Sequence, residues 1–345
     1  MVRILEYAQL SAIARGFSLL GSGGGGTTSL LELALADTSA WPITLYDIAD
    51  LDPALPCLGA AFVGSTMLLG ERLPCEAPFA PLIHAAERWL GERIPVVCSL
   101  EGGGLNGLTS LLFASERRLV DADFTGRAVP DLDQMSLLVD HVPGIFATCD
   151  TGVGGVLLVQ TDRPIDLERV IRSAVIQAGG TGGAVFAGFT VGDLADHAIH
   201  GSIARALELG TAFETAAQAT LSELAEALGG RVLGQGRIMV IELDARDPHV
   251  SAVEVGGEAG EIHRIITRSE SLAFMTDGRL EASTPTIIVV LDAISRDILQ
   301  VTDLTIARNI SIIELPGPEW WSGSAERIRH VVPSAYGLAE LDGGV

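Results

Sequence analysis

The segment from Val120 to Asp131 places two carboxylates two residues apart, at Asp121 and Asp123, ahead of Arg127. On a strand these two side chains share a face, and on a turn they can converge on one proton or one cation. Repulsion between paired carboxylates can keep one of them protonated, which sets a general base beside a general acid. Arg127 can bind a substrate carboxylate through two hydrogen bonds. The alternative is a surface turn with ordinary solvated charges.

A glycine loop could supply further groups. It consists of Gly23, Gly24, Gly25 and Gly26, and it lies between two segments with helical apolar spacing. A glycine loop that leads into a helix exposes backbone N–H groups, which suit an anion or a polarised carbonyl. The spacing differs from the GxGxxG of dinucleotide-binding turns, so we expect no nucleotide. The alternative is a flexible turn between two helices.

A second glycine-rich turn, at 101–107, carries a carboxylate at Glu101 and an amide at Asn106. It follows a predicted strand, as the segment from Asp121 does. Both should therefore lie at the carboxyl ends of strands, where open α/β sheets bind ligands. The candidate catalytic carboxylates are Asp121, Asp123 and Glu101.

A third cluster, between Asp193 and His200, could hold a metal ion. Asp193 and His197 are four residues apart, and so are Asp196 and His200, so on a helix each pair lies on one face. Imidazole and carboxylate groups suit zinc or another transition ion. A solvated helix face is the alternative, because no third histidine is near in sequence. One divalent metal ion is left open, with Asp121, Asp123, His197 and His200 as candidate ligands.

Alternating helical and strand-like segments should position these groups. Apolar spacing predicts a helix over 5–20, and further helices and strands alternate up to residue 122. This alternation is typical of an α/β layer with a largely parallel sheet. The remaining elements are a helix over 30–36, strands over 43–47 and 60–64, a helix over 81–91, a strand over 94–99, a helix over 108–118 and a strand over 119–122.

The second half of the chain changes character. The segment 165–229 reads as mostly helical, with glycine interruptions around 179–183. Beyond it, runs rich in Ile and Val alternate with turn residues, which indicates a β-rich part. We therefore expect two domains, an α/β N-terminal domain over 1–165 and a C-terminal domain over 166–345 with a helical segment followed by strands, α+β overall. The strand-like runs are 231–243, 261–267, 286–291 and 308–314.

Composition excludes several functions. The formal net charge is −22, which argues against nucleic acid and anionic membranes as partners. The chain has no lysine, so all 22 of its Lys and Arg residues are Arg. A Schiff base with pyridoxal phosphate is therefore impossible, and a Walker-type phosphate loop would lack its lysine. The expected partner is a small-molecule substrate.

The cysteines and the first residues indicate the compartment. The four cysteines form no CxxC pair, and the chain starts without a secretory pattern. We expect a soluble cytoplasmic protein with free thiols that forms a homo-oligomer. Cys98 is a weak candidate nucleophile, because buried strand cysteines are usually inert. The cysteines are Cys57, Cys75, Cys98 and Cys149.

The same segments resemble the S-methyl-thiohydantoin desulfurase family, formerly a domain of unknown function. Residues 20–26 are similar to its opening LG(T/C)GGGG element, and 101–106 to its E-x-GG-x-N turn. The most specific match is 120–131, which follows V-D-A-D-x-x-G-R-A-x-P-E with Asp131 in place of Glu. The helix motif at 201–210 and the closing P-x-x-(F/Y)-G at 333–337 extend the resemblance over nearly the whole chain.

The resemblance implies a two-domain protein and an enzyme that removes sulfur from a thiohydantoin ring. In such chemistry water attacks the ring carbon that bears sulfur and a thiol leaves, with a carboxylate as base and loop N–H groups stabilising charge. It also implies association with a hydantoinase- or oxoprolinase-type protein. The substrate-binding candidates are Gly23, Gly24, Gly25, Gly26, Asn106, Arg127, Asp131 and Glu270.

The C-terminal part departs from the family pattern. The Q-N-E-x-L stretch is Arg268–Leu272 here and keeps only Glu270 and Leu272, while Thr286 replaces an Asp of P-D-L-I. Two functions therefore stay open. The favoured one is a hydrolase of a five-membered thiohydantoin- or hydantoin-like ring. The other is a non-catalytic accessory or ligand-sensing subunit that has kept the pocket and lost the chemistry.

Overall fold

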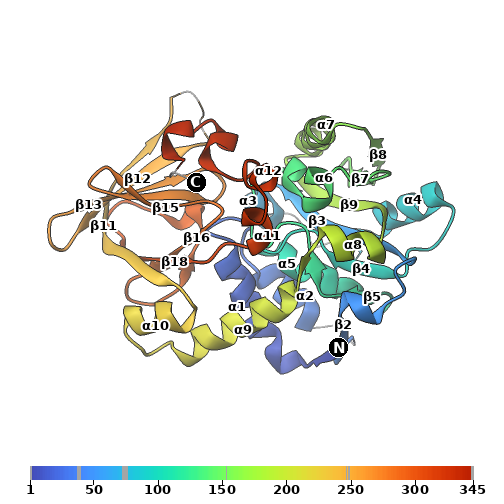
Figure 1. Ribbon diagram of the computed structural model, residues 1–345, viewed down its shortest axis with the longest axis horizontal. Helices are drawn as coiled ribbons and strands as arrows, with labels where there is room; N and C mark the ends of the chain where they lie inside the picture. The colour runs from blue at the N-terminus through green and yellow to red at the C-terminus, as the bar shows by residue number, and fades with distance from the viewer. Residues whose placement is uncertain are drawn as a thin grey trace.

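The structure is a computed structural model that describes residues 2–36, 40–71, 77–152, 154–245, 247 and 249–342. Figure 1 shows two units side by side, an α/β unit built mostly from the first half of the chain and a β-rich unit from the second half. The predicted fold class, an α/β N-terminal domain with a β-rich C-terminal domain, is therefore confirmed. Cys75 lies outside the described residues.

The first unit contains an eight-stranded sheet in the order β1-β2-β5-β4-β3-β9-β7-β8. Only its central strands β2, β5, β4 and β3 run parallel, and every other neighbouring pair is antiparallel. The expectation of a largely parallel sheet therefore holds for half of it. Its strands are Arg3–Leu5 (β1), Ile43–Tyr46 (β2), Pro56–Gly64 (β3), Val96–Ser99 (β4), Arg118–Val120 (β5), Phe146–Asp150 (β7), Val156–Gln160 (β8) and Thr181–Thr190 (β9).

Helices cover both faces of this sheet because each has one apolar side. One core joins the sheet to α1, α2 and α4, and a second core joins it to α6, α7 and α8. The first core continues through α9 and α10 into the second unit, so the units share buried apolar surface. The helices are Leu10–Leu20 (α1), Ser29–Ala36 (α2), Thr66–Gly70 (α3), Ala80–Leu90 (α4), Asn106–Thr109 (α5), Ser136–Val139 (α6), Pro164–Gln177 (α7), Val191–His197 (α8), Ser202–Thr215 (α9) and Leu221–Ala227 (α10).

Two glycines allow α1 and α9 to cross in close contact. A Cβ added at Gly16 would lie 1.8 Å from the carbonyl oxygen of Ala206, and one at Gly210 would lie 1.7 Å from that of Ala12. No side chain fits at either position, so the two helix backbones meet directly. This crossing fixes α9, which carries Ser202 at its first position, against the N-terminal unit.

The second unit is an eight-stranded antiparallel sheet in the order β15-β14-β13-β12-β11-β18-β16-β17. After β18 the chain returns to the first unit through α11 (Glu319–Ser322) and α12 (Ala325–Ile328), which lie between the two units in Figure 1. The strands are Arg231–Leu243 (β11), Ser251–Gly257 (β12), Ile262–Thr267 (β13), Ser271–Thr276 (β14), Arg279–Ser283 (β15), Ile287–Asp292 (β16), Ile298–Leu299 (β17) and Asn309–Leu315 (β18).

The segment 165–229 differs from the mostly helical prediction. Its glycine-bearing stretch at Thr181–Thr190 forms β9, which pairs with β3 and β7 inside the first sheet. Glycines 182 and 183 pack against Asp150 and Phe79, so their lack of a side chain serves close packing inside a strand. The first sheet is therefore completed at residue 190, beyond the expected boundary at 165.

The helix expected over 108–118 is also shorter than predicted. It consists of α5 (Asn106–Thr109) followed by a 3₁₀ turn over Ser110–Phe113. Among the described residues, no helix is long and apolar enough to cross a membrane.

Candidate functional site

The three glycine-bearing loops at 21–26, 101–107 and 121–131 lie against one another. The N–H of Leu105 donates to the carbonyl of Gly25 over 3.0 Å, and the N–H of Ala128 donates to that of Leu20 over 3.1 Å. A Cβ added at Gly104 would lie 2.4 Å from the Gly25 backbone, so this contact requires glycine. Segments that are far apart in sequence thus lie together, although the pocket described next is lined by residues of 121–131 and, among the described residues, not by 23–26 or 101–107.

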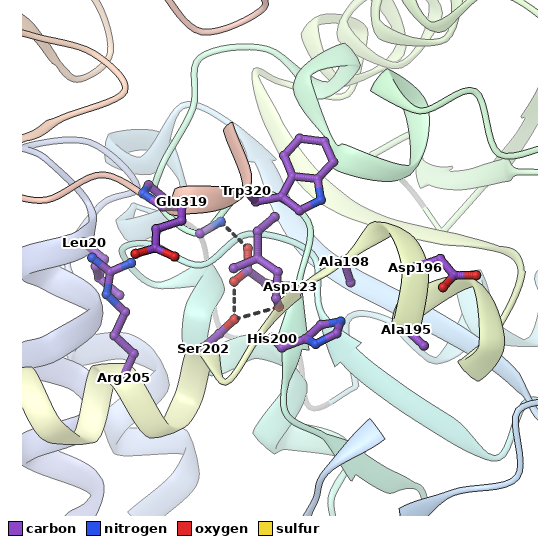
Figure 2. Close-up of a pocket in the computed structure, with 13 residues that line it drawn as sticks. Leu20, Asp123, Ala195, Asp196, Ala198, His200, Ser202, Arg205, Glu319 and Trp320 are labelled. Carbon is purple, nitrogen blue, oxygen red and sulfur yellow. Dashed lines mark hydrogen bonds between the residues drawn. The ribbon is translucent and has the colours of Figure 1, made fainter. Parts of the chain in front are cut away.

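The loop 121–131 has two sides that face different surroundings. One side borders an open pocket of about 470 Å³, and the other faces the second unit. Figure 2 shows that the pocket side chains come from this loop, from α8 and α9, and from the α11 segment. The pocket is lined by Leu20, Asp123, Gly126, Ala195, Asp196, Ala198, Ile199, His200, Ser202, Arg205, Pro318, Glu319 and Trp320.

Asp123 is the buried carboxylate at the wall of this pocket, with 0% of its surface exposed. Its Oδ1 accepts hydrogen bonds from the N–H groups of Thr125, at 2.6 Å, and Gly126, at 2.5 Å. Its Oδ2 accepts a short hydrogen bond from the hydroxyl of Ser202. Removal from water raises the pKa of Asp123 above its ordinary value, although these hydrogen bonds oppose the rise. A carboxylate held in this way is a stronger base than an exposed one.

The first turn of α9 places Ser202 opposite Asp123. The strands β6 (Ala122–Asp123) and β10 (Ile199–His200) pair antiparallel, and the N–H of Gly201 donates to the carbonyl of Asp121. Gly201 has a φ of 74°, the left-handed conformation that glycine adopts easily, and this turns the chain into the helix. The pairing of β6 with β10 and the turn at Gly201 together fix the position of Ser202 opposite Asp123.

Asp121, in contrast, is engaged by the N-terminus of α9. Its Oδ1 accepts from the N–H of Ile203 over 2.7 Å, and its Oδ2 accepts from that of Ala204 over 3.3 Å. Burial raises its pKa to about 6, and these two hydrogen bonds oppose the rise. Asp121 and Asp123 do not converge on one proton: the first holds the helix and the second faces Ser202.

Cationic, aromatic and imidazole groups complete the pocket (Figure 2). The guanidinium of Arg205 donates to the carbonyl of Pro316 over 2.8 Å, and burial lowers the pKa of Arg205, whereas the charges of Asp123 and Glu319 oppose this. Trp320 lies against the guanidinium of Arg327, whose central carbon is 4.1 Å from the ring centre. A small polar ring would meet an aromatic side chain, a cation and a hydroxyl here.

On the other side of the loop, Arg127 ties the two units together. It is 1% exposed, and its Nη1 donates to the hydroxyl of Thr284, at 3.1 Å, and to the carbonyls of Pro285, at 3.2 Å, and Thr286, at 2.7 Å. Its Nε donates to the carbonyl of Ala128. These contacts occupy the guanidinium with the segment between β15 and β16. They support a role in domain attachment, whereas the sequence suggested a clamp for a substrate carboxylate.

Two carboxylates with raised pKa values face Arg127. Burial raises the pKa of Glu101 to about 7, while hydrogen bonds from Asn106 and the N–H of Val129 oppose the rise. Burial also raises the pKa of Glu270 to about 8, and the nearby charge of Glu101 adds to it, whereas Arg127 lowers it. Near neutral pH these values keep Glu270 largely protonated and Glu101 partly protonated.

Glu270 is packed more tightly than the other acids of this region. It is 2% exposed, and its Oε2 has no hydrogen-bond partner among the residues that the structure describes. A Cβ added at Gly24 would lie 2.5 Å from its Cγ, so the glycine loop covers this side chain directly. The loop is also bonded to the second unit, because the N–H of Val301 donates to the carbonyl of Gly23 over 2.7 Å. Glycines 23 and 24 thus contact β14 and its neighbours.

Asp131 and Asn106 also have structural partners. Asp131 accepts from Arg172 of α7 over 3.1 Å and from Arg268 over 2.9 Å, so it bridges the two units. The amide of Asn106 donates to Glu101 over 2.8 Å and exchanges two hydrogen bonds with the backbone of Phe62. Tyr336 lies near enough to Arg127 for their charges to interact. We name as the interdomain cluster the group formed by Glu101, Arg127, Asp131, Glu270 and Tyr336.

The four candidate metal ligands do not converge on one point. His197 Nδ1 is 2.8 Å from Asp140, and His200 Nε2 is 3.0 Å from the carbonyl of Leu194. Asp121 and Asp123 are bonded to α9 as described above. Within the described part of the chain, no group of three His, Cys, Asp or Glu side chains could hold a metal ion. These residues therefore do not fit the metal site expected from spacing.

Several pocket and cluster residues were not assigned a role from the sequence. Ser202 and Arg205 belong to the helix motif, and Tyr336 to the closing motif, but composition and spacing gave no chemistry for them. Trp320 and Glu319 had no signal at all. Only the resemblance of the surrounding motifs could have pointed to the first three residues.

Comparisons with known proteins agree with this two-part architecture. A family model described as "S-Me-THD-like, N-terminal domain" matches residues 8–161, and one described as "S-Me-THD-like, C-terminal domain" matches residues 161–343. A crystal structure of a protein from Chromobacterium violaceum is similar over 98% of both chains, with a TM-score of 0.81 and 21% sequence identity, which shows a shared fold. A comparison with curated proteins found no match.

Proposed function

The chain belongs to the S-Me-THD-like family, and we propose that it is a hydrolase that removes sulfur from a five-membered thiohydantoin- or hydantoin-like ring. The observation that carries this proposal is the buried carboxylate of Asp123 at the wall of a pocket of about 470 Å³. Ligand pockets commonly enclose roughly 300–1,000 Å³, so a single five-membered ring with a substituent fits this volume. The pocket also lies beyond the carboxyl ends of parallel strands, where such sheets bind ligands.

In the proposed reaction, water attacks the ring carbon that bears sulfur. One proton of the water passes to Asp123 and then to the departing sulfur, the other reaches a ring nitrogen, and the oxygen stays on the carbon as a carbonyl. Burial supports the first transfer, because a raised pKa makes the carboxylate of Asp123 a better proton acceptor. The cation of Arg205 is placed to stabilise negative charge that develops on the ring.

The experiment is to mix the purified protein with S-methyl-thiohydantoin. We expect methanethiol and hydantoin to appear in equal amounts, measured by a thiol reagent and by mass spectrometry. Boiled protein is the control for spontaneous hydrolysis. No release above that control, for this compound or for unmethylated thiohydantoin, would contradict the proposed reaction.

One observation favours the second function, a non-catalytic accessory or ligand-sensing subunit beside a hydantoinase- or oxoprolinase-type enzyme. All the hydrogen bonds that Asp123 accepts come from its own loop and Ser202, so the carboxylate also works as a structural element. This function predicts that the ring compound binds, measured by calorimetry, without turnover. Turnover by the isolated protein would reject it.

A further inference from the structure

Asp123 lines the pocket, but 0% of its surface is exposed and both of its carboxylate oxygens have partners. Its Oδ1 is occupied by the N–H groups of Thr125 and Gly126, and its Oδ2 by the hydroxyl of Ser202. Gly102 packs on the same Oδ2, because a Cβ added there would lie 2.5 Å from that oxygen. A water molecule in the pocket therefore meets Ser202 before it meets Asp123.

The hydroxyl of Ser202 can donate one hydrogen bond and accept another, as a proton relay requires. A serine hydroxyl has one proton to donate and two lone pairs that accept. The hydroxyl donates to Asp123, a hydrogen bond drawn as a dashed line in Figure 2, and its contact with the carbonyl of Ile199 is 3.4 Å long. Ser202 also lines the pocket, so a lone pair of its oxygen can accept a proton from that side.

We propose that Ser202 is a catalytic proton relay between the pocket and Asp123. This inference rests on the proposed function and adds the route of the proton. As water attacks the ring carbon, the oxygen of Ser202 accepts its proton while the hydroxyl proton of Ser202 moves to Asp123. The serine ends with one proton, as it began, and no bond forms between Ser202 and the substrate.

The rigid position of Ser202 supports this role. The carboxylate of Asp121 holds the N–H groups of the next two residues, and the close crossing of α9 with α1 prevents the helix from shifting. A relay must keep both hydrogen bonds short during the transfer, and a fixed helix start provides that alignment. Asp121 thus acts through Ser202, as a positioning residue.

The first test compares three variants with wild-type protein, with S-methyl-thiohydantoin as the probe. Ser202→Ala should lower kcat about 10²-fold with little change in KM, the size of effect that lost acid–base catalysis typically produces. Ser202→Thr keeps the hydroxyl and should stay within about 10-fold of wild type. Thr211→Ala, on the same helix with an exposed side chain that bonds only the carbonyl of Leu207, is the matched control and should be unchanged.

A second measurement needs no variant. In mixtures of light and heavy water, the single-turnover rate of wild type should fall along a curved line, because two protons move together. A straight line, which means one proton in flight, would overturn the relay. So would full activity of Ser202→Ala, and so would a covalent adduct on Ser202 in acid-quenched samples. Wild-type protein without turnover would overturn the proposed function and the relay together, whereas active protein that does not depend on Ser202 would overturn the relay alone.

Discussion

On the pocket side of the loop 121–131, the buried carboxylate of Asp123 accepts hydrogen bonds only from neutral donors. On the other side, Glu101 and Glu270 lie near enough to the buried cation of Arg127 for their charges to interact with it. Neutral donors hold a carboxylate in place and leave it able to take up a proton. In the interdomain cluster the guanidinium of Arg127 donates to carbonyls and a hydroxyl of the second unit, and removing a donor from buried acceptors costs stability. The comparison suggests that chemistry belongs to the pocket and domain attachment to the interdomain cluster.

The largest expected effect is the one that distinguishes Asp123 from Asp121. Asp123→Asn should lower kcat by about 10²–10⁴-fold with folding intact, because the nearly isosteric amide still accepts the loop N–H groups but takes up no proton. Thermal unfolding and circular dichroism check the fold, and steady-state kinetics give kcat and KM.

Asp121→Asn is the matched control for that variant, since the same chemical change is made two residues away. It should lower the stability by about 0.3–1 kcal/mol, as expected when a negative charge is lost at a helix N-terminus, and lower kcat far less than Asp123→Asn does. Equal losses of kcat in both variants would contradict the assignment of Asp123 as the base and of Asp121 as a residue that only positions Ser202.

The next effect belongs to the interdomain cluster. Arg127→Ala should reduce the free energy of unfolding by several kcal/mol, because the hydroxyl of Thr284 and the carbonyls after it lose their donor. Each buried polar group left without a partner costs about 1–3 kcal/mol. Arg329→Ala, which removes an exposed ion pair with Glu326, should cost no more than about 1 kcal/mol. If Arg127→Ala instead keeps its stability and raises KM for an acidic ring compound, Arg127 is a substrate clamp after all.

A smaller effect should appear in the pH dependence of stability. The folded chain holds protons on Glu101 and Glu270 at pH values where the unfolded chain has released them, because their pKa values rise from 4.5 to about 7 and about 8. The stability from these groups is therefore fully present below about pH 4.5 and is lost as the pH rises to about 8, on the order of a few kcal/mol. Melting temperatures measured from about pH 5 to about pH 8.5 test this loss of stability, because that range covers both pKa shifts.

Glu270→Gln should make that decline shallower, since the amide stays neutral across the range. Glu258→Gln, at a solvent-exposed position of the turn after β12, is the control and should leave the slope as it is in wild type. Parallel slopes for wild type and Glu270→Gln would mean that Glu270 is already ionised when folded.

Local patterns predicted much of this fold. The runs 231–243, 286–291 and 308–314 match β11, β16 and β18 within a residue, because runs rich in Ile and Val between turn residues favour strands. β9 was missed, because its glycines read as breaks in a helix, and its place between β3 and β7 depends on contacts distant in sequence. Long-range pairing of this kind leaves no local periodicity.

The contact between the glycine-bearing loops could be expected, but the partners of their side chains could not. Glycine spacing and strand ends were enough to expect that the loops meet. Asp121 and Asp123 have different roles because they bond different groups at the start of α9. The bonded partners are 82 and 79 residues away in sequence. The burial of Arg127 likewise depends on a strand connection 157–159 residues away. Neither contact could be inferred from neighbours in sequence.

The measurement that tests the central claim most directly is a crystal structure of the Asp123→Asn variant with S-methyl-thiohydantoin bound. We predict the ring in the pocket beside Trp320 and Arg205, with its sulfur-bearing carbon facing the hydroxyl of Ser202 through one water molecule. Density for the ring among Glu101, Arg127 and Glu270 would place the chemistry in the interdomain cluster and contradict the account.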